Sequence, residues 1–240
     1  MQLSPRLAAV ARLILPGSRV ADVGTDHGHL PVWLITEGGC PFVVATDVAP
    51  GPLDAARRSA ARAGGLSGVE FRLADGLGAV SPDEVDTVVI AGMGGETTLG
   101  IIERAPWLKL GAHRMILQPQ SKVPELLDGL AAAGYRVDDQ HLAAETGRMY
   151  TMFEVTAGVV EPPVGGLRYV NRALLERGDP LLGAYLDMLT ARLGRMLRGL
   201  EQAGTEPERR AELARAIADF ERWQKIPLLG GVPEGRGGRP

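Results

Sequence analysis

The chain has 240 residues, of which 45% are hydrophobic and 23% charged, as is typical of a soluble globular protein with one substantial domain and an appendage. The net charge of -3 does not indicate a nucleic-acid-binding protein, and we expect no DNA partner. A single cysteine, Cys40, excludes an internal disulfide and argues against a cysteine-ligated metal. No apolar run approaches the about 20 residues of a membrane span, and Arg6 and Arg12 interrupt the apolar N-terminal stretch. We therefore expect a first helix there, in a cytoplasmic protein with no metal and no membrane partner.

Strand-like and helical segments alternate over the first 160 residues. Five short, β-branched, apolar runs lie at 18–24, 41–48, 69–75, 85–93 and 114–119. Helical stretches lie between them at 30–38, 51–64, 96–105 and 123–134. The runs do not alternate strictly between apolar and polar residues, as in strands buried on both faces. This pattern predicts a parallel sheet with helices on both sides.

The pattern changes after residue 134. Two strand candidates, 135–145 and 148–158, are separated by Thr146-Gly147, which is a hairpin signal, although "HLAAE" is a weak strand by propensity. Five parallel strands followed by an antiparallel hairpin make a seven-stranded, Rossmann-like α/β sheet. That ending differs from the commonest dinucleotide-binding topology.

A Pro/Gly-rich linker, 159–166, precedes two amphipathic segments joined by "GTEPE". Apolar residues recur every three or four positions, first at Leu182, Tyr185, Leu186, Leu189, Leu193, Met196, Leu197 and Leu200, and then at Leu213, Ile217, Phe220 and Trp223. Such stripes predict an antiparallel helical hairpin. We expect a domain at 1–160, this hairpin at 161–226 and a flexible, Gly/Pro-rich tail at 227–240.

The basic residues are unevenly distributed between these segments. Residues 1–160 contain 13 basic and 18 acidic residues, whereas residues 161–226 contain 11 and 10. The basic character of the chain therefore lies in its C-terminal third, almost entirely as arginine.

Three of the expected strands end in an aspartate: Asp22, Asp47 and Asp75. The carboxyl ends of parallel strands form the ligand-binding edge of such a sheet. An acid after the second strand suits ribose hydroxyls, and one after the third suits an adenine amino group. Gly24 and Gly28 allow a ligand to approach the backbone closely. The set predicts an adenosine-containing cofactor.

The first turn, "DVGTDHG", indicates which cofactor. A pyrophosphate requires bare backbone N–H groups, so Asp22 and Asp26 would repel it. The same carboxylates attract a cation such as the amino or sulfonium group of S-adenosyl-L-methionine. Asp22 also suits a purely structural role in fixing the turn, and His27 and His29 suit packed or solvent-facing positions.

The fourth strand ends in "IAGMGGE", without the Asn/Asp-Pro-Pro-aromatic loop common in enzymes that methylate exocyclic amines. Gly92, Gly94 and Gly95 leave an open floor for a flat ligand, or form a tight turn before a helix. Gln118, at the end of the fifth strand, has an amide suited to a base edge.

These motifs, read together, resemble one known family. "DVGTDHGHLP", "ATDVAPGPLDAAR", "RLADGL", "VVIAGMGGE", "MILQP" and "ETGRMYTMFEV" occur in this order in bacterial tRNA (adenine-N1)-methyltransferases that act on adenine 22. The resemblance covers roughly residues 3–200, and the pairing of "TDHG" with "AGMGG" is its most specific part. It implies a seven-stranded methyltransferase domain with a C-terminal helical hairpin, S-adenosyl-L-methionine as cofactor and tRNA as substrate.

The resemblance and the residues together give three sets of expected site residues. The cofactor-binding set is Asp22, Gly24, Thr25, Gly28, Asp47, Val48, Asp75, Gly76, Gly92 and Met93. The catalytic set is Asp26 and His27. The substrate-binding set is Gly94, Gly95, Gln118, Arg192, Arg195 and Arg198.

Adenine N1 has an in-plane lone pair, so methylation needs positioning more than deprotonation. We assign Asp26 to stabilising the charge that develops on the base, and His27 to stacking on the base or accepting a proton. The target base has to be turned out of the folded tRNA. Arg192, Arg195 and Arg198 are spaced to face phosphates, or form an ordinary solvated face.

Other classes of function remain open. One is a small-metabolite methyltransferase that uses the helical hairpin as a dimer interface, and another is a non-catalytic adenosine- or RNA-binding module. A nicotinamide-dependent oxidoreductase is a third and more distant alternative. We expect a monomer or a weak dimer.

Overall fold

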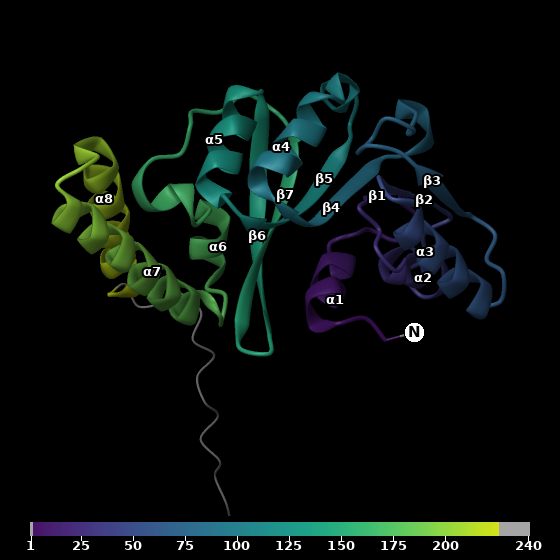
Figure 1. The fold of residues 1–240 in the computed structure, drawn as a ribbon, viewed down its shortest axis with the longest axis horizontal. Coiled ribbons are helices and arrows are strands. Elements are labelled where there is room, and N and C mark those ends of the chain that lie inside the picture. The colour runs from purple at the N-terminus through teal and green to yellow at the C-terminus, as the bar shows by residue number, and fades with distance from the viewer. Residues whose placement is uncertain (1, 226–240) are drawn as a thin grey trace, which may run out of the picture. The chain divides into compact units, whose positions relative to one another are not determined.

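The computed structural model describes residues 2–225, within which seven strands form one mixed sheet (Figure 1). The strand order is β3-β2-β1-β4-β5-β7-β6. The strands are β1 (Arg19–Val23), β2 (Phe42–Asp47), β3 (Val69–Leu73), β4 (Thr87–Gly94), β5 (Arg114–Ser121), β6 (Tyr135–Glu145) and β7 (Arg148–Ala157). Strands β1 to β5 run parallel, and β7 runs antiparallel to both β5 and β6. The expected fold class is confirmed.

Helices α2 (His29–Thr36), α3 (Pro50–Arg62) and α4 (Gly95–Glu103) connect parallel strands, as the alternating pattern predicts. Helix α1 (Pro5–Arg12) precedes β1, α5 (Val123–Ala132) leads from β5 to β6, and a 3-10 turn at Pro82–Glu84 lies between β3 and β4. Ser4 caps α1, because its hydroxyl accepts a hydrogen bond from the backbone N–H of Leu7. None of the described helices is long and apolar enough to cross a membrane.

Both faces of the sheet are buried, which explains why its strands read as continuous apolar runs. Along β4, Val88 and Ile90 belong to one hydrophobic cluster and Val89 belongs to the other. The first cluster includes Ile102 of α4 and residues of α5, whereas the second includes Val10 of α1 and residues of α2. Adjacent side chains of a strand point to opposite faces, so the sheet forms the middle of three layers.

Helix α1 is tied to the sheet by a charged cluster near its C-terminal end. Arg114 of β5 donates a hydrogen bond of 2.7 Å to the carbonyl of Leu13 and pairs with Glu154 of β7. His141 of β6 contacts the other oxygen of Glu154 at 2.7 Å. The bond to His141 and the pairing with Arg114 lower the pKa of Glu154 to about 2. The charge of Glu154 therefore persists at any ordinary pH, and the cluster holds α1 beside β5.

The chain divides into two compact units, the second beginning at Val164. The second unit contains α6 (Arg172–Arg177), α7 (Leu182–Ala203) and α8 (Pro207–Gln224). Gln224 at the end of α8 donates a hydrogen bond of 2.7 Å to Asp187 near the start of α7, so the two helices run antiparallel. The expected helical hairpin is confirmed.

The second unit differs from the sequence-based expectation in three respects. Helix α6 lies in a stretch for which no helix was expected. A 3-10 turn at Gly165–Arg168 lies at the end of the expected linker, where Gly166 is buried and its N–H donates a hydrogen bond to Asp219. Met196, expected on the buried stripe of α7, is 40% exposed. The expected flexible tail, 227–240, lies outside the described residues.

Candidate functional site

The expected site residues of the first unit lie at the carboxyl edge of the parallel strands. Strand order reverses between β1 and β4, which are neighbours in the sheet and are followed by helices on opposite faces. Ligands of open α/β sheets bind at this switch point. The turn after β1 and the bulged end of β4 therefore form the centre of the candidate site.

The turn after β1 is held close to β2. The N–H groups of Gly24 and Thr25 donate to the carbonyl of Thr46 at 2.8 and 3.1 Å. Gly24 has φ +79° and Gly28 has φ +70°, the left-handed region that favours glycine. A Cβ on Gly28 would lie 2.7 Å from the Cβ of Ala56 in α3, so this turn requires glycine for space as well as for conformation.

Thr46 connects two turns and was not among the expected site residues. Its buried hydroxyl donates a hydrogen bond of 2.8 Å to the carbonyl of Gly76, after β3. Its carbonyl accepts the two N–H groups of the first turn. The only sequence signal was its place directly before Asp47. Thr46 therefore sets the spacing between the turns that follow β1 and β3.

Asp22 is a buried carboxylate without a cationic partner. Its exposed fraction is 5%, and it forms no ion pair with any residue in 2–225. Burial raises the pKa of Asp22 to about 6, Thr25 opposes this rise, and the charge of Asp47 adds to it. A buried acid in this state is stabilised by a cation placed against it.

Asp47 and Val48 form the end of β2. One oxygen of Asp47 accepts the N–H of Ala49 at 2.9 Å, which fixes the carboxylate at the start of α3. The other carboxylate oxygen of Asp47 has no hydrogen bond among the described residues. Val48 is 68% exposed, an unusual position for a large apolar side chain. The pair presents an acceptor beside an apolar surface.

Asp75 is exposed after β3 and pairs at 3.0 Å with Arg104, the residue directly after α4. A pair this exposed contributes little to stability and separates readily. Gly76, next to it, is buried, and a Cβ there would lie 2.9 Å from Ile101. Asp75 can accept a ligand's amino group once Arg104 moves aside.

These observations fit an adenosine cofactor that carries a positive charge. Asp22 is a buried acid without a cationic partner, Asp47 has an acceptor oxygen without a hydrogen bond among the described residues, and Val48 is an exposed apolar side chain. Gly24 keeps the approach open, since a Cβ there would lie 2.3 Å from the terminal methyl of Met93. No basic side chain among the described residues pairs with Asp22 or Asp47, so their negative charge would oppose a pyrophosphate at this edge.

Asp26 and His27 protrude from the first turn. Their side chains are 78% and 60% exposed, and His27 Nε2 lies 3.5 Å from Asp26 Oδ1. Asp26 has φ +50°, which is uncommon for a residue other than glycine or asparagine. The His27 and His29 rings are 5.8 Å apart. The turn thus presents a carboxylate and an imidazole to whatever covers this edge.

The glycines of "AGMGG" belong to the end of β4 and to the start of α4. The pairing of β4 with β5 shifts register on both sides of Met93, which is a bulge. Gly92 has φ +83°, and a Cβ on Gly95 would lie 2.4 Å from the carbonyl of Lys122. Gly94 precedes α4, and its carbonyl accepts the Thr98 hydroxyl at 3.0 Å. These positions therefore require glycine for conformation at Gly92 and for close packing at Gly95, and the open floor for a flat ligand stays a prediction.

Gln118 has a different environment from the one expected of a base-binding amide. It is 1% exposed, and its oxygen accepts a hydrogen bond of 2.8 Å from Arg6 Nη1. Its amide nitrogen donates to the carbonyl of Pro119 at 3.2 Å. In this structure Gln118 holds Arg6, a residue that the sequence analysis did not select.

The three arginines of α7 are all exposed. Arg192, Arg195 and Arg198 form no ion pair within residues 2–225, whereas Arg209 and Arg222 of α8 pair with Glu212 and Asp219. No acidic residue occurs between Met188 and Leu200. This stretch of α7 is therefore a positively charged surface without internal compensation.

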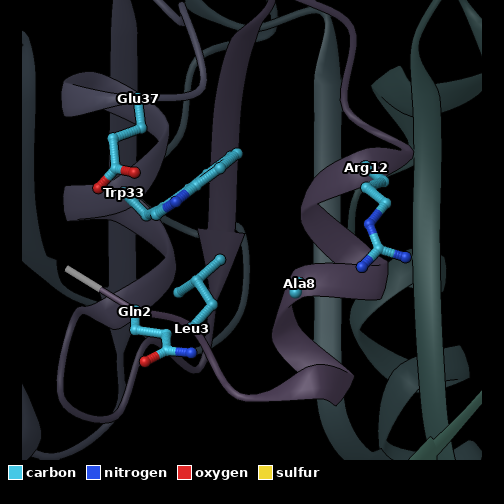
Figure 2. A pocket seen from close by; sticks show the side chains of 6 residues that line it. All are labelled: Gln2, Leu3, Ala8, Arg12, Trp33 and Glu37. Carbon is cyan, nitrogen blue, oxygen red and sulfur yellow. The ribbon is translucent and has the colours of Figure 1, made fainter.

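A surface pocket of about 490 Å³ lies elsewhere in the first unit, between α1 and α2. Figure 2 shows Trp33 extending from α2 toward α1, with Arg12 and Glu37 on opposite sides. The residues that line this pocket are Gln2, Leu3, Ala8, Arg12, Trp33 and Glu37. None of them is an expected site residue, so the chemistry of the strand ends is separate from this pocket.

Comparison with known proteins shows where this arrangement recurs. Residues 3–153 match the family described as "Methyltransferase domain". The tRNA (adenine(22)-N(1))-methyltransferase of Bacillus subtilis is 32% identical over 158 residues, which span 66% of this chain and 66% of that protein.

Two solved structures extend the similarity to nearly the whole chain. The crystal structure of the B. subtilis m1A22 tRNA methyltransferase is 26% identical, with a TM-score of 0.79, and the match covers 93% of this chain and 99% of that one. A Streptococcus pneumoniae protein crystallised with S-adenosyl-L-methionine is 28% identical, with a TM-score of 0.76, and the match covers 93% and 100%. Both matches extend beyond the methyltransferase domain.

Proposed function

The chain belongs to the methyltransferase-domain family, and we propose that it uses S-adenosyl-L-methionine to methylate N1 of adenine 22 in tRNA, in the cytoplasm. The observation that carries this proposal is the buried, unpaired carboxylate of Asp22 at the switch point, beside Asp47. It suits a cationic, adenosine-containing cofactor. The relatives named above support the same cofactor and the same substrate.

The cofactor, when bound, supplies an electrophilic methyl group on a sulfonium. Asp22 would face its positive charge, and Asp47 would accept from its ribose hydroxyls. Asp75 would accept from its adenine amino group, after release from Arg104. Gly24, Thr25, Gly28, Gly76, Gly92, Val48 and Met93 would shape the cavity around it.

The target adenine needs no base to remove a proton before N1 reacts, so the protein's task is to orient it and to exclude water. Gly94 and Gly95 would let the flat base approach the backbone. Asp26 would stabilise the positive charge that develops on the base, and His27 would stack on it or accept a proton afterwards. The exposure of Asp26 and His27 leaves both available to a macromolecular substrate.

Methyl transfer from labelled S-adenosyl-L-methionine to unmodified bulk tRNA, followed by nucleoside analysis, tests the proposal. We expect N1-methyladenosine, and we expect it to disappear from a tRNA transcript in which adenine 22 is replaced. Binding of the cofactor without methylated tRNA would contradict the proposed substrate. It would favour a small-molecule substrate or a non-catalytic binding protein.

We further propose that Arg192, Arg195 and Arg198 contact tRNA phosphates. Replacing all three by glutamine should weaken tRNA binding at least 10-fold in low salt and reduce the slope of log K against log salt by about 2 to 3. Binding measured by filter retention across a salt series checks both values. The control variant replaces Arg209 and Arg222 by glutamine. Because both arginines are already paired with acids, this variant should leave the slope of log K against log salt nearly unchanged.

A further inference from the structure

Arg6 of α1 reaches the substrate side of the candidate site. Its Nη1 donates to Gln118 at 2.8 Å, and a Cβ placed on Gly92 would lie 3.7 Å from the same nitrogen. Its guanidinium carbon lies 5.9 Å from the centroid of the Tyr150 ring in β7. Arg6 therefore lies beside Gly92, at the bulged end of β4.

The charge of Arg6 is not compensated by the first unit. Three arginines of that unit, Arg6, Arg72 and Arg114, are half-buried. Arg72 pairs with Glu84 and Arg114 pairs with Glu154, whereas Arg6 has no acidic partner among the described residues. Partial burial without a counter-charge is costly, and an anionic ligand removes that cost.

One nitrogen of the Arg6 guanidinium is held by Gln118, whereas the other has no hydrogen bond among the described residues. Gln118 is fully buried and bonded on both sides of its amide, so it is a rigid anchor for one guanidinium nitrogen. The opposite nitrogen of Arg6 has no hydrogen-bond acceptor among the described residues. One edge of the guanidinium is therefore available for a ligand.

We propose that Arg6 binds a phosphate flanking the target adenosine and so holds the turned-out nucleotide in the site. This inference rests on the proposed function. The base itself is a poor partner for Arg6, because methylation at N1 makes the base cationic. A flanking phosphate is anionic, accompanies the base, and accepts two parallel N–H bonds from a guanidinium.

Steady-state methylation of tRNA by the Arg6→Met variant tests the inference. We expect kcat/KM to fall about 10- to 100-fold, as for loss of a hydrogen bond to a charged group. Arg6→Lys should recover part of the loss, because it keeps the charge without the fork. The matched control is Arg12→Met, which removes a charge from the exposed far end of the same helix and should change kcat/KM less than twofold.

A second measurement separates phosphate binding from a structural role. Neutral methylphosphonate linkages are placed on either side of adenine 22, and wild type and Arg6→Met are compared on each tRNA. One of the two linkages should lower wild-type kcat/KM about 10-fold while changing the variant less than threefold. S-adenosyl-L-methionine affinity should be equal in both proteins, which shows that the variant is folded.

The outcomes are distinct. The inference would be overturned if each methylphosphonate linkage lowered kcat/KM by the same factor in Arg6→Met as in wild type. The proposed function would remain intact. Unchanged kcat/KM in Arg6→Met would do the same. A wild-type protein that methylates no tRNA would overturn the proposed function, and the inference with it.

Discussion

Replacing Asp26 by asparagine is expected to lower kcat for tRNA methylation about 100-fold, while the affinity for S-adenosyl-L-methionine stays within twofold of wild type. The carboxylate faces positive charge only as that charge develops on the adenine, so its loss affects the reaction more than cofactor binding. Asparagine is the suitable substitute, because Asp26 has φ +50° and asparagine tolerates this region. Single-turnover kinetics with saturating tRNA measure the step directly.

Asp54→Asn provides the matched control for Asp26→Asn. Asp54 is an exposed carboxylate of α3 paired with Arg57 of the same helix, so its neutralisation should leave kcat unchanged. A kcat within threefold of wild type for Asp26→Asn would remove Asp26 from the mechanism. His27, the next exposed residue of the turn, would then be the side chain to test.

Replacing Asp22 by asparagine is expected to stabilise the cofactor-free protein and to weaken cofactor binding. The folded pKa of Asp22, about 6, lies above its ordinary value of 3.8. Ionisation of Asp22 therefore destabilises the fold as pH rises from about 4 to about 6, and the full cost is present above that range. It amounts to at most about 3 kcal/mol. In urea unfolding, the free energy of unfolding of Asp22→Asn should rise relative to that of wild type between about pH 4 and about pH 6, and the difference should stay constant above that range.

Cofactor binding should follow the opposite trend. A cationic ligand favours the ionised form of Asp22, so wild-type affinity for S-adenosyl-L-methionine should fall as pH decreases below about 6. In Asp22→Asn the affinity should be about 10- to 100-fold lower at pH 7.5 and nearly independent of pH between 5 and 7. Calorimetric titration across this range provides the measurement. Equal affinity in the two proteins would mean that Asp22 has only a structural role.

Most of the fold was predictable because it depends on local pattern. The β-branched runs locate all five parallel strands within a few residues, and Thr146-Gly147 marks the hairpin between β6 and β7. Even "HLAAE", a weak strand by propensity, is part of β6, because pairing with β7 outweighs intrinsic preference. Helix α6 was not predicted, since its six residues are too few for a periodic pattern.

The site was predictable where backbone position alone decides it. Asp22, Asp47 and Asp75 lie at strand ends, so the parallel topology brings them to one edge. The role of Gln118 depends instead on Arg6, which is 112 residues away in the chain, and no local signal reports such a contact. Thr46 was missed for the same reason, because its hydroxyl partner is the carbonyl of Gly76. The functional roles of the site residues remain predictions.

Helix α1 precedes β1 in the chain, but the residues that hydrogen-bond to it come much later. Arg6 depends on Gln118, and the carbonyl of Leu13 depends on Arg114, 101 residues away. Closing loops of this length is slow compared with local helix formation. During synthesis on a ribosome, α1 can pack against β1 and α2 early, but the hydrogen bonds of Arg6 and of the Leu13 carbonyl can form only after β5 has emerged. Arg6 is therefore expected to reach its position beside Gln118 only after that step, so a nascent fragment ending before β5 is expected to lack the RNA contact proposed for Arg6.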